Sequence, residues 1–402
     1  MLSTEEVARR LGVKPATVYA YVSRGLLHSR RNGAGKGSLF DEAEVAAFAA
    51  GRRAATPVVH TGITLIRDGR LFYRGRDVAD LARTETYESV VSLLWTGSTG
   101  HSTFAAPASM RALGEAVTAP LPHAARIADR LRVVVAAAAA SDPLRFDTSP
   151  EAVSATGRSM LAVMVDALPV RAAGEPAEPG LAQRLWRRLS PQPPTATGLA
   201  ALNAALVLLA DHDLAASTLA ARVAASTRAH PYAVVGAGLA VLDGPLHGAA
   251  SVLAHDLLTD ATRTGDPVRT ISGRLRVGAT IPGFGHPLYP GGDPRATTLL
   301  RLLRTAATED GSADSRPGAP RGVVAVMDEL IGAMARRPGT APNIDFALAA
   351  LARLYDMSAD AGEAIFAVAR TAGWIAHALE EYADRPSRFR PSGRYDGRSP
   401  AS

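Results

Sequence analysis

The 402-residue chain contains no cysteine. Disulfides, thiolate metal sites, iron–sulfur clusters and a thiol nucleophile are therefore excluded. Lysine is almost absent as well, since Lys14 and Lys36 stand against 42 arginines. Beyond Lys36 no side-chain amine remains that can form a Schiff base or anchor pyridoxal phosphate.

Long apolar runs are also missing. The longest uncharged stretches, residues 89–110 and 189–210, are interrupted by Gly, Ser, Thr or Pro, whereas a bilayer span needs roughly 20 predominantly apolar residues. The N-terminus is polar and acidic and lacks the apolar segment of a signal peptide. We therefore expect a cytoplasmic protein with no membrane partner. The length and the 47% hydrophobic content suit two packed domains and a small third.

The positive charge is concentrated at the N-terminus. Residues 1–56 hold nine Lys or Arg and five Asp or Glu, and so contribute +4 of the total charge of +6. Within this segment Ser3 and Glu6 form a capping-box pattern that predicts a short helix, and Pro15 marks the start of a second. A basic surface for a partner is therefore expected in this segment.

A basic, glycine-rich loop with the sequence HSRRNGAGKGSLF follows the two helices. Asp41 and Glu44 then form a second capping-box pattern before a third helix. This order resembles the winged helix-turn-helix of the MerR type, in which the second helix enters the major groove of DNA and the loop forms the wing. The resemblance implies a helix-turn-helix domain over residues 1–56 with DNA as its partner. The alternative is an extension that only packs or dimerises.

The rest of the chain is predicted to be mainly α-helical. Asp68 and Gly69 mark a tight hairpin between two short strands, and most of the later sequence has apolar residues at three- and four-residue spacing. The GxSxG, HExxH and paired-cysteine motifs do not occur. Histidine, aspartate and arginine therefore remain as candidates for chemistry.

His247 lies in the segment LDGPLHGAASVLAHDLL, in which Gly244 and Pro245 signal a helix start. We expect His247 in the first turn, where the positive end of the helix dipole lowers the pKa of the imidazole and keeps it neutral. A neutral imidazole can donate a hydrogen bond to an oxygen that gains negative charge, such as that of an enolising carbonyl. The alternative is a hydrogen-bonded structural histidine.

Asp345 lies in APNIDFALAAL, where Pro342 and Asn343 mark another helix start. The helix dipole is expected to keep this carboxylate ionised, which suits a base. The alternative is an acidic residue that only complements the dipole. A carboxylate is too weak to remove a proton from carbon unaided. A neutral His247 would be the right complement, because it can stabilise the enolate.

Further segments contain histidine or arginine in distinctive contexts. His286 and Arg295 lie in IPGFGHPLYPGGDPRA, Arg370 in ARTAGWIAH and Arg390 in RPSGRY. Together with GPLHGAA and PNIDF, these motifs have the order and separations of the citrate synthase family, which the chain resembles from about residue 63 to residue 397. YRGRDVADLA and TYESVVSLLWTG resemble the opening of that family.

The resemblance implies a nearly all-helical, citrate synthase-like fold. It divides the chain into a large domain at 57–250 and 353–402 and a small domain at 251–352 that closes over the substrates. It also implies a homodimer in which Arg390 reaches across the interface. No metal and no cofactor is expected, since coenzyme A arrives as part of a substrate.

The resemblance also implies roles for the residues of the site. His247 would donate a hydrogen bond to the thioester oxygen of acetyl-CoA or propionyl-CoA, and Asp345 would remove the proton from the acyl α-carbon. His286 would bind and polarise the ketone of oxaloacetate. The carboxylates of oxaloacetate would be held by His212, Arg295, Arg370 and Arg390.

The leading hypothesis is therefore a condensing enzyme that forms citrate or 2-methylcitrate and free CoA. Two alternatives remain open: a DNA-binding regulator that uses the pocket as a sensor for citrate or oxaloacetate, and a citryl-CoA lyase. The sequence departs from the family pattern after His286, where Pro-Leu-Tyr-Pro stands in place of the common Arg-Val-Tyr-Lys. This departure removes two positive charges near the expected CoA site.

Overall fold

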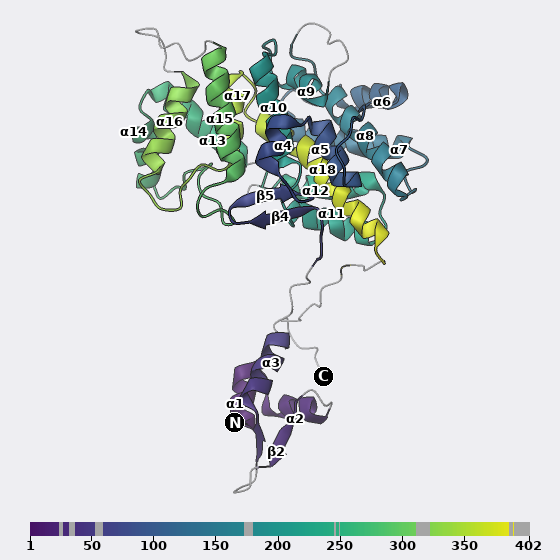
Figure 1. Ribbon diagram of the computed structural model, residues 1–402, viewed down its shortest axis with the longest axis vertical. Coiled ribbons are helices and arrows are strands. Elements are labelled where there is room, and N and C mark those ends of the chain that lie inside the picture. Colours follow the sequence, from purple (N-terminus) through teal and green to yellow (C-terminus); the bar gives the residue numbers. More distant parts are fainter. Residues whose placement is uncertain are drawn as a thin grey trace. The chain divides into compact units, whose positions relative to one another are not determined.

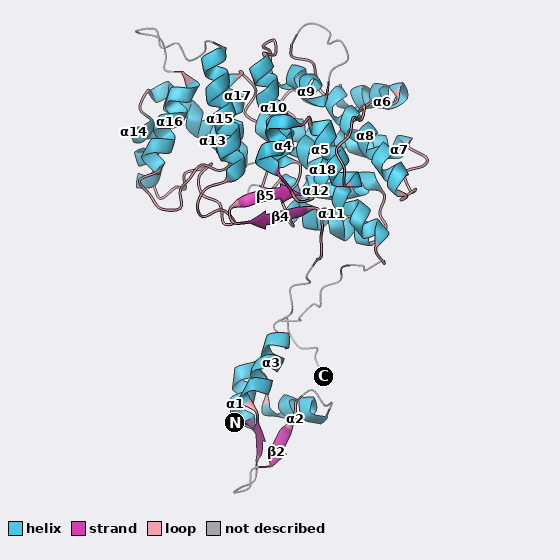
Figure 2. Cartoon of the chain, viewed as in Figure 1, coloured by secondary structure: helices cyan, strands magenta, loops and turns pink. Residues whose placement is uncertain are grey.

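The computed structural model describes residues 1–23, 27–31, 37–52, 59–172, 180–244, 247–248, 250–310, 322–385 and 389. The chain forms two compact units, Met1–His60 and Thr61–Ser402 (Figure 1). Helices predominate in both (Figure 2), and the described residues contain eighteen helices and two three-stranded sheets. The predicted mainly α-helical class is confirmed.

The N-terminal unit combines three helices with a small antiparallel sheet of strand order β1-β3-β2. Its elements are β1 (Leu2–Ser3), α1 (Thr4–Leu11), α2 (Pro15–Ser23), β2 (Ser29–Arg31), β3 (Ser38–Phe40) and α3 (Glu42–Arg52). The unit has a core of its own, made of Val7, Ala8, Val18, Leu27, Phe40 and Val45. The paired strands β2 and β3 lie where the wing was predicted.

The first helix begins at the predicted capping box. The Ser3 hydroxyl accepts a hydrogen bond from the Glu6 backbone, and the Glu6 carboxylate accepts one from the Ser3 backbone. The second predicted box is only half formed. Asp41 accepts backbone hydrogen bonds in the first turn of α3, whereas the Glu44 carboxylate accepts one from the His28 backbone. Glu44 therefore ties α3 to the segment before β2.

The second unit opens with strands β4 (Thr64–Arg67), β5 (Arg70–Tyr73) and β6 (Arg76–Asp77). Asp68 and Gly69 join the first two strands with φ angles of 52° and 70°, so the predicted hairpin is confirmed. The helices in the described part of this unit are α4 (Val78–Thr84), α5 (Tyr87–Thr96), α6 (Ala108–Thr118), α7 (Ile127–Ser141), α8 (Pro150–Asp166), α9 (Leu181–Leu189), α10 (Ala196–Leu209), α11 (Ala216–Ser226), α12 (Pro231–Leu242), α13 (Ala250–Thr264), α14 (Pro267–Arg276), α15 (Pro294–Glu309), α16 (Val323–Met334), α17 (Ile344–Leu354) and α18 (Ala361–Ala383).

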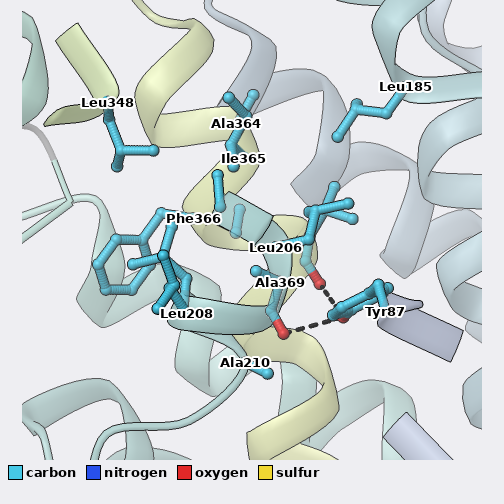
Figure 3. Close-up of a cluster of buried hydrophobic side chains, with 14 of the residues drawn as sticks. Tyr87, Leu185, Leu206, Leu208, Ala210, Leu348, Ala364, Ile365, Phe366 and Ala369 are labelled. Carbon is cyan, nitrogen blue, oxygen red and sulfur yellow. Dashed lines mark hydrogen bonds between the residues drawn. The ribbon is translucent and has the colours of Figure 1, made fainter. Parts of the chain in front are cut away.

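Helix α18 runs through the core of the second unit. Every residue from Ala361 to Ala378 is buried, as expected for a helix that is covered on all sides. Figure 3 shows a hydrogen-bond contact to this helix from Tyr87 of α5. The Tyr87 hydroxyl lies 3.0 Å from the Val368 carbonyl oxygen and 2.9 Å from the Ala369 carbonyl oxygen. Such contacts fix α18 as the support for side chains that project from it.

Helices α13 to α17 gather on one side of the second unit, away from α6 to α8 (Figure 1). They span nearly the predicted small domain at 251–352, since α13 begins one residue before it and α17 ends two residues after it. The boundaries and the closure of that domain stay a prediction. Within the described ranges, no helix is long and apolar enough to cross a membrane.

Candidate active site

A cavity of about 620 Å³ lies in the second unit. Six of the seven predicted site residues line it, namely His212, His247, His286, Arg295, Asp345 and Arg370. The seventh, Arg390, lies outside the described residues. The fold thus brings together side chains from segments that are widely separated in the sequence.

The loop that carries His286 is held against the segment that carries Asp345. The Gly285 backbone N–H donates to the Ala341 carbonyl (2.7 Å), and the Asn343 side-chain amide donates to the Gly285 carbonyl (3.0 Å). Asn343 is also the N-cap of α17, of which Asp345 is the second residue. One asparagine therefore positions both the loop and the helix.

His286 and Arg295 lie side by side in the cavity. The Leu288 backbone N–H lies 3.2 Å from His286 Nδ1. Arg295 Nη2, which can only donate, lies 3.3 Å from Nε2. Burial and the charge of Arg295 lower the pKa of His286, which favours the neutral ring at pH 7. An oxygen atom of a ligand could therefore lie against both the imidazole and the guanidinium group.

Arg295 is fixed by Asp293, a residue that sequence analysis did not single out. Arg295 Nε donates to Asp293 Oδ1 (3.0 Å) and Nη2 donates to Oδ2 (2.8 Å). Asp293 Oδ2 also accepts a hydrogen bond from the Ile344 backbone at the start of α17 (3.0 Å). The position of Asp293 in the GGDPRA motif, as the N-cap of α15, was a signal for this role.

Arg370 on α18 differs from Arg295 because no described residue forms such an ion pair with it. The side chain is buried, Nε donates to the Leu209 carbonyl (2.8 Å), and Cζ lies 4.6 Å from the centre of the Phe366 ring. Neither terminal nitrogen has a hydrogen-bond partner among the described residues. Burial lowers the pKa of Arg370 to about 10. A guanidinium fork of this kind is suited to a carboxylate that accepts two parallel hydrogen bonds.

His247 lies in a turn before α13, so its predicted place in the first helical turn is wrong. The helix begins three residues later, at Ala250. The ring is neutral, as expected, but for another reason: burial and then the charge of Arg370 lower the pKa of His247 to about 4. Its Nε2 lies 2.8 Å from the Ser217 hydroxyl, and its ring meets the Phe366 ring edge-on at 5.5 Å.

Asp345 lies in the first turn of its helix, as predicted, and the Asn343 side chain accepts a hydrogen bond from its backbone (3.1 Å). The expectation that the helix dipole keeps it ionised is wrong. Burial raises the pKa of Asp345 to about 7, Arg295 opposes this rise and Asp293 adds to it. A carboxyl group with this pKa is a stronger base than an ordinary aspartate and is partly ionised at neutral pH.

His212 is the most buried histidine of the cavity, with 7% of its surface exposed. Its Nε2 lies 2.9 Å from the Tyr289 hydroxyl, and its ring centre lies 5.4 Å from that of His286. Burial, followed by Arg295 and Arg370, lowers its pKa well below the usual value. Tyr289, which sequence analysis did not single out, thus links His212 to the loop of His286.

The cavity combines neutral histidines and a carboxyl group of raised pKa with two buried arginines. One arginine has a salt-bridge partner, and the other has none among the described residues. This set favours a ligand with carboxylate groups and can stabilise an oxygen that gains negative charge. Across the described residues, no group of three or more His, Asp or Glu is placed to hold a metal ion.

Two protein families match the chain. Residues 53–392 match the family described as "Citrate synthase, C-terminal domain". Residues 1–53 match the family described as "Helix-turn-helix domain".

Individual relatives agree with the larger match. The chain is 32% identical to the citrate synthase of Haloferax volcanii over 355 residues, which cover 82% of this chain and 90% of that protein. It is 29% identical to 2-methylcitrate synthase 2 of Corynebacterium glutamicum over 349 residues, which cover 81% of this chain and 88% of that protein.

Solved structures share the fold. The citrate synthase of Thermoplasma acidophilum, in a ternary complex with carboxymethyl coenzyme A and oxaloacetate, matches with a TM-score of 0.69 and 23% identity over 88% of this chain and 97% of that one. The citrate synthase of Pyrobaculum aerophilum matches with a TM-score of 0.71 and 22% identity, over 93% of this chain and 96% of that one.

Proposed function

The chain belongs to the citrate synthase family, and we propose that it condenses an acyl-CoA with oxaloacetate to give a citrate-type acid and free CoA. The observation that carries this proposal is a single cavity lined by Asp345, His247, His286 and the buried fork of Arg370. Acetyl-CoA would yield citrate, and propionyl-CoA would yield 2-methylcitrate. Relatives of both names match the chain at similar identity.

In the proposed reaction Asp345 removes a proton from the acyl α-carbon. His247 donates a hydrogen bond to the thioester oxygen as the enol forms, and a neutral imidazole suits this role because it keeps its proton until the oxygen gains charge. The enol carbon then attacks the ketone carbon of oxaloacetate, and the ketone oxygen, which accepts hydrogen bonds from His286, takes up a proton in place of the one removed from the acyl carbon. Water cleaves the resulting citryl-CoA thioester and releases the CoA thiol.

The carboxylates of oxaloacetate would be held by Arg370, Arg295 and His212. We propose that Arg390 of a second copy of the chain completes this set, so that the working form is a homodimer. The reaction as proposed uses no cofactor beyond the CoA of its substrate, because the side chains supply both the base and the electrophilic groups. The proposed location is the cytoplasm, where acyl-CoA is available.

Thiol release tests this proposal. We expect the CoA thiol to appear when the protein is mixed with oxaloacetate and either acetyl-CoA or propionyl-CoA, and only when both substrates are present. Asp345→Asn should lower the rate by about 10²- to 10⁴-fold, since it removes the base. Asp166→Asn is the matched control, because Asp166 pairs with Arg184 and does not line the cavity. A wild-type protein that releases no thiol with either acyl-CoA would contradict the proposal.

For the N-terminal unit we propose a second function, binding to DNA. The exposed Lys14 precedes α2, Tyr19 on α2 is 52% exposed, and Arg30 on β2 is exposed as well. The nearby acidic Glu42 is paired with Arg10 at 2.6 Å. An exposed basic side chain just before the second helix, an exposed aromatic side chain on that helix and an exposed arginine on the wing suit contacts to phosphates and base edges.

Salt-dependent DNA binding tests this second function. The double substitution Lys14→Ala and Arg30→Ala should weaken binding and reduce the slope of log K against log salt by about 2, the value for two lost phosphate contacts. Arg301→Ala is the control, because Arg301 is an exposed arginine on α15 in the other unit. Fluorescence anisotropy of a labelled duplex provides the measurement. Absence of binding by the wild type at about 50 mM salt would contradict the proposal.

A further inference from the structure

Asp211 is a buried carboxylate beside the cavity that the proposed reaction does not use. It has no exposed surface and directly precedes His212. Its Oδ2 accepts hydrogen bonds from the Thr64 hydroxyl (2.5 Å) and from His377 Nε2 (3.3 Å). Its Oδ1 has no hydrogen-bond partner within the described part of the chain. A buried negative charge of this kind requires a compensating positive charge.

His377 does not provide that charge. Arg222 Nη1 lies 2.8 Å from His377 Nδ1, and because a guanidinium group can only donate, Nδ1 is an unprotonated acceptor. The single ring proton is therefore on Nε2 and points to Asp211. The charge of Arg222 is itself balanced by Glu380 at 2.8 Å and Glu381 at 2.6 Å. This chain of contacts holds Asp211 in place without neutralising it.

Asp211 lies beside the part of α18 that carries the buried Arg370, since Arg370 Nε donates to the carbonyl of Leu209, two residues before Asp211. The Asp211 carboxylate packs against Gly373, where an added Cβ would come within 2.4 Å of Oδ1. Gly373 follows Arg370 by three residues and therefore lies on the same face of the helix. Burial lowers the pKa of Arg370, and the charge of Asp211 opposes this effect. Burial acts to raise the pKa of Asp211, but the hydrogen bond from His377 and the charge of Arg370 lower it overall.

We propose that Asp211 is a positioning residue that acts through Arg370, as the counter-ion that stabilises this guanidinium in the empty cavity. A bidentate ion pair, such as the one Asp293 makes with Arg295, would occupy the terminal nitrogens of Arg370. A carboxylate one turn away balances the charge and leaves both nitrogens free for the substrate. The same balance weakens the attraction between the cavity and an anionic ligand, because the negative charge of Asp211 repels it.

Asp211→Asn isolates the charge, because the amide oxygen can keep both hydrogen bonds that Oδ2 accepts. The empty variant should have a lower melting temperature than the wild type, since Arg370 is then buried without its counter-ion. Oxaloacetate should bind more tightly, with the Kd reduced by about tenfold, the effect of one charge at an effective dielectric constant of about 20. Titration calorimetry measures this change. A purely structural role for Asp211 predicts weaker binding instead.

Arg370→Gln tests whether the effect passes through Arg370. Glutamine keeps a donor for the Leu209 carbonyl in place of Arg370 Nε. In this background Asp211→Asn should lower the melting temperature less than it does in the wild type, and it should no longer increase the affinity for oxaloacetate. Asp166→Asn is again the control, since it breaks an ion pair away from the cavity. It should lower the melting temperature without changing the Kd.

Two results would overturn the inference: additive effects of the two substitutions on stability, or weaker binding of oxaloacetate by Asp211→Asn. The inference rests on the proposed function only for the identity of the ligand. A wild-type protein that neither binds nor converts oxaloacetate would contradict the proposed function instead. The stability measurements on the empty protein would then still decide whether Asp211 and Arg370 are coupled.

Discussion

In this cavity, burial affects the charge of a side chain more than the position of its residue on a helix does. Asp345 lies where the helix dipole favours a carboxylate, yet burial raises its pKa to about 7. His247 lies before the first turn of α13, and burial still lowers its pKa to about 4. A local sequence indicates where a helix begins, but the burial of a side chain depends on distant segments of the chain. The pKa values of these two residues were therefore beyond sequence analysis.

The raised pKa of Asp345 predicts the pH dependence of the reaction. Only the ionised form can accept a proton, so kcat/KM should rise with pH up to about 7 and stay level above it. His247 should add no inflection near neutral pH, because its pKa of about 4 keeps the ring neutral there. Rates of thiol release between about pH 5.5 and 9 provide the measurement. A profile without an inflection near 7 would show that Asp345 does not act as the base with this pKa.

Among the elements, α18 connects the core to the cavity. It carries Arg370 and His377, and the Gly373 N–H donates to the Ala210 carbonyl in the segment that leads to His212 (2.9 Å). The sequence motif ARTAGWIAH indicated Arg370 but not this contact. A close approach of two backbones has no signature beyond a glycine, and the chain has 36 glycines. Only the packing shows which of them matter.

Two glycine substitutions separate packing from helix propensity. Gly373→Ala would place a Cβ 2.5 Å from the Ala210 carbonyl oxygen, so the backbone must shift. We expect a loss of about 1–3 kcal/mol in the free energy of unfolding and a higher KM for oxaloacetate. Gly332→Ala on α16 meets nothing within 4 Å and should be neutral or stabilise the fold by about 0.5–1 kcal/mol. Urea denaturation measures the free energy of unfolding of both variants. Equal changes in the two would contradict the role of packing at Gly373.

At the scale of the whole molecule, the sequence predicted the residues that line the cavity better than the residues that hold them in place. Short motifs identified five residues of the cavity, because each has a distinctive local context, and the family resemblance added His212. The partners Arg222, His377 and Asp211 were missed, since the hydrogen bonds among them join residues 155 and 166 positions apart. Such contacts form only when the helices pack. The division into a large domain and a small domain at 251–352 remains a prediction, as does the part that Arg390 plays.

The identity of the reaction product distinguishes a condensing enzyme from a lyase and from a ligand-binding protein. The protein is incubated with acetyl-CoA and oxaloacetate, the mixture is analysed by mass spectrometry, and the measurement is repeated with propionyl-CoA and with citryl-CoA. We expect citrate or 2-methylcitrate in an amount equal to the free CoA thiol, and formation of either product about 10²- to 10⁴-fold more slowly with Asp345→Asn. Cleavage of citryl-CoA to acetyl-CoA and oxaloacetate without net synthesis would indicate a lyase. That outcome, or binding of oxaloacetate with no conversion of either acyl-CoA, would contradict the proposed condensation.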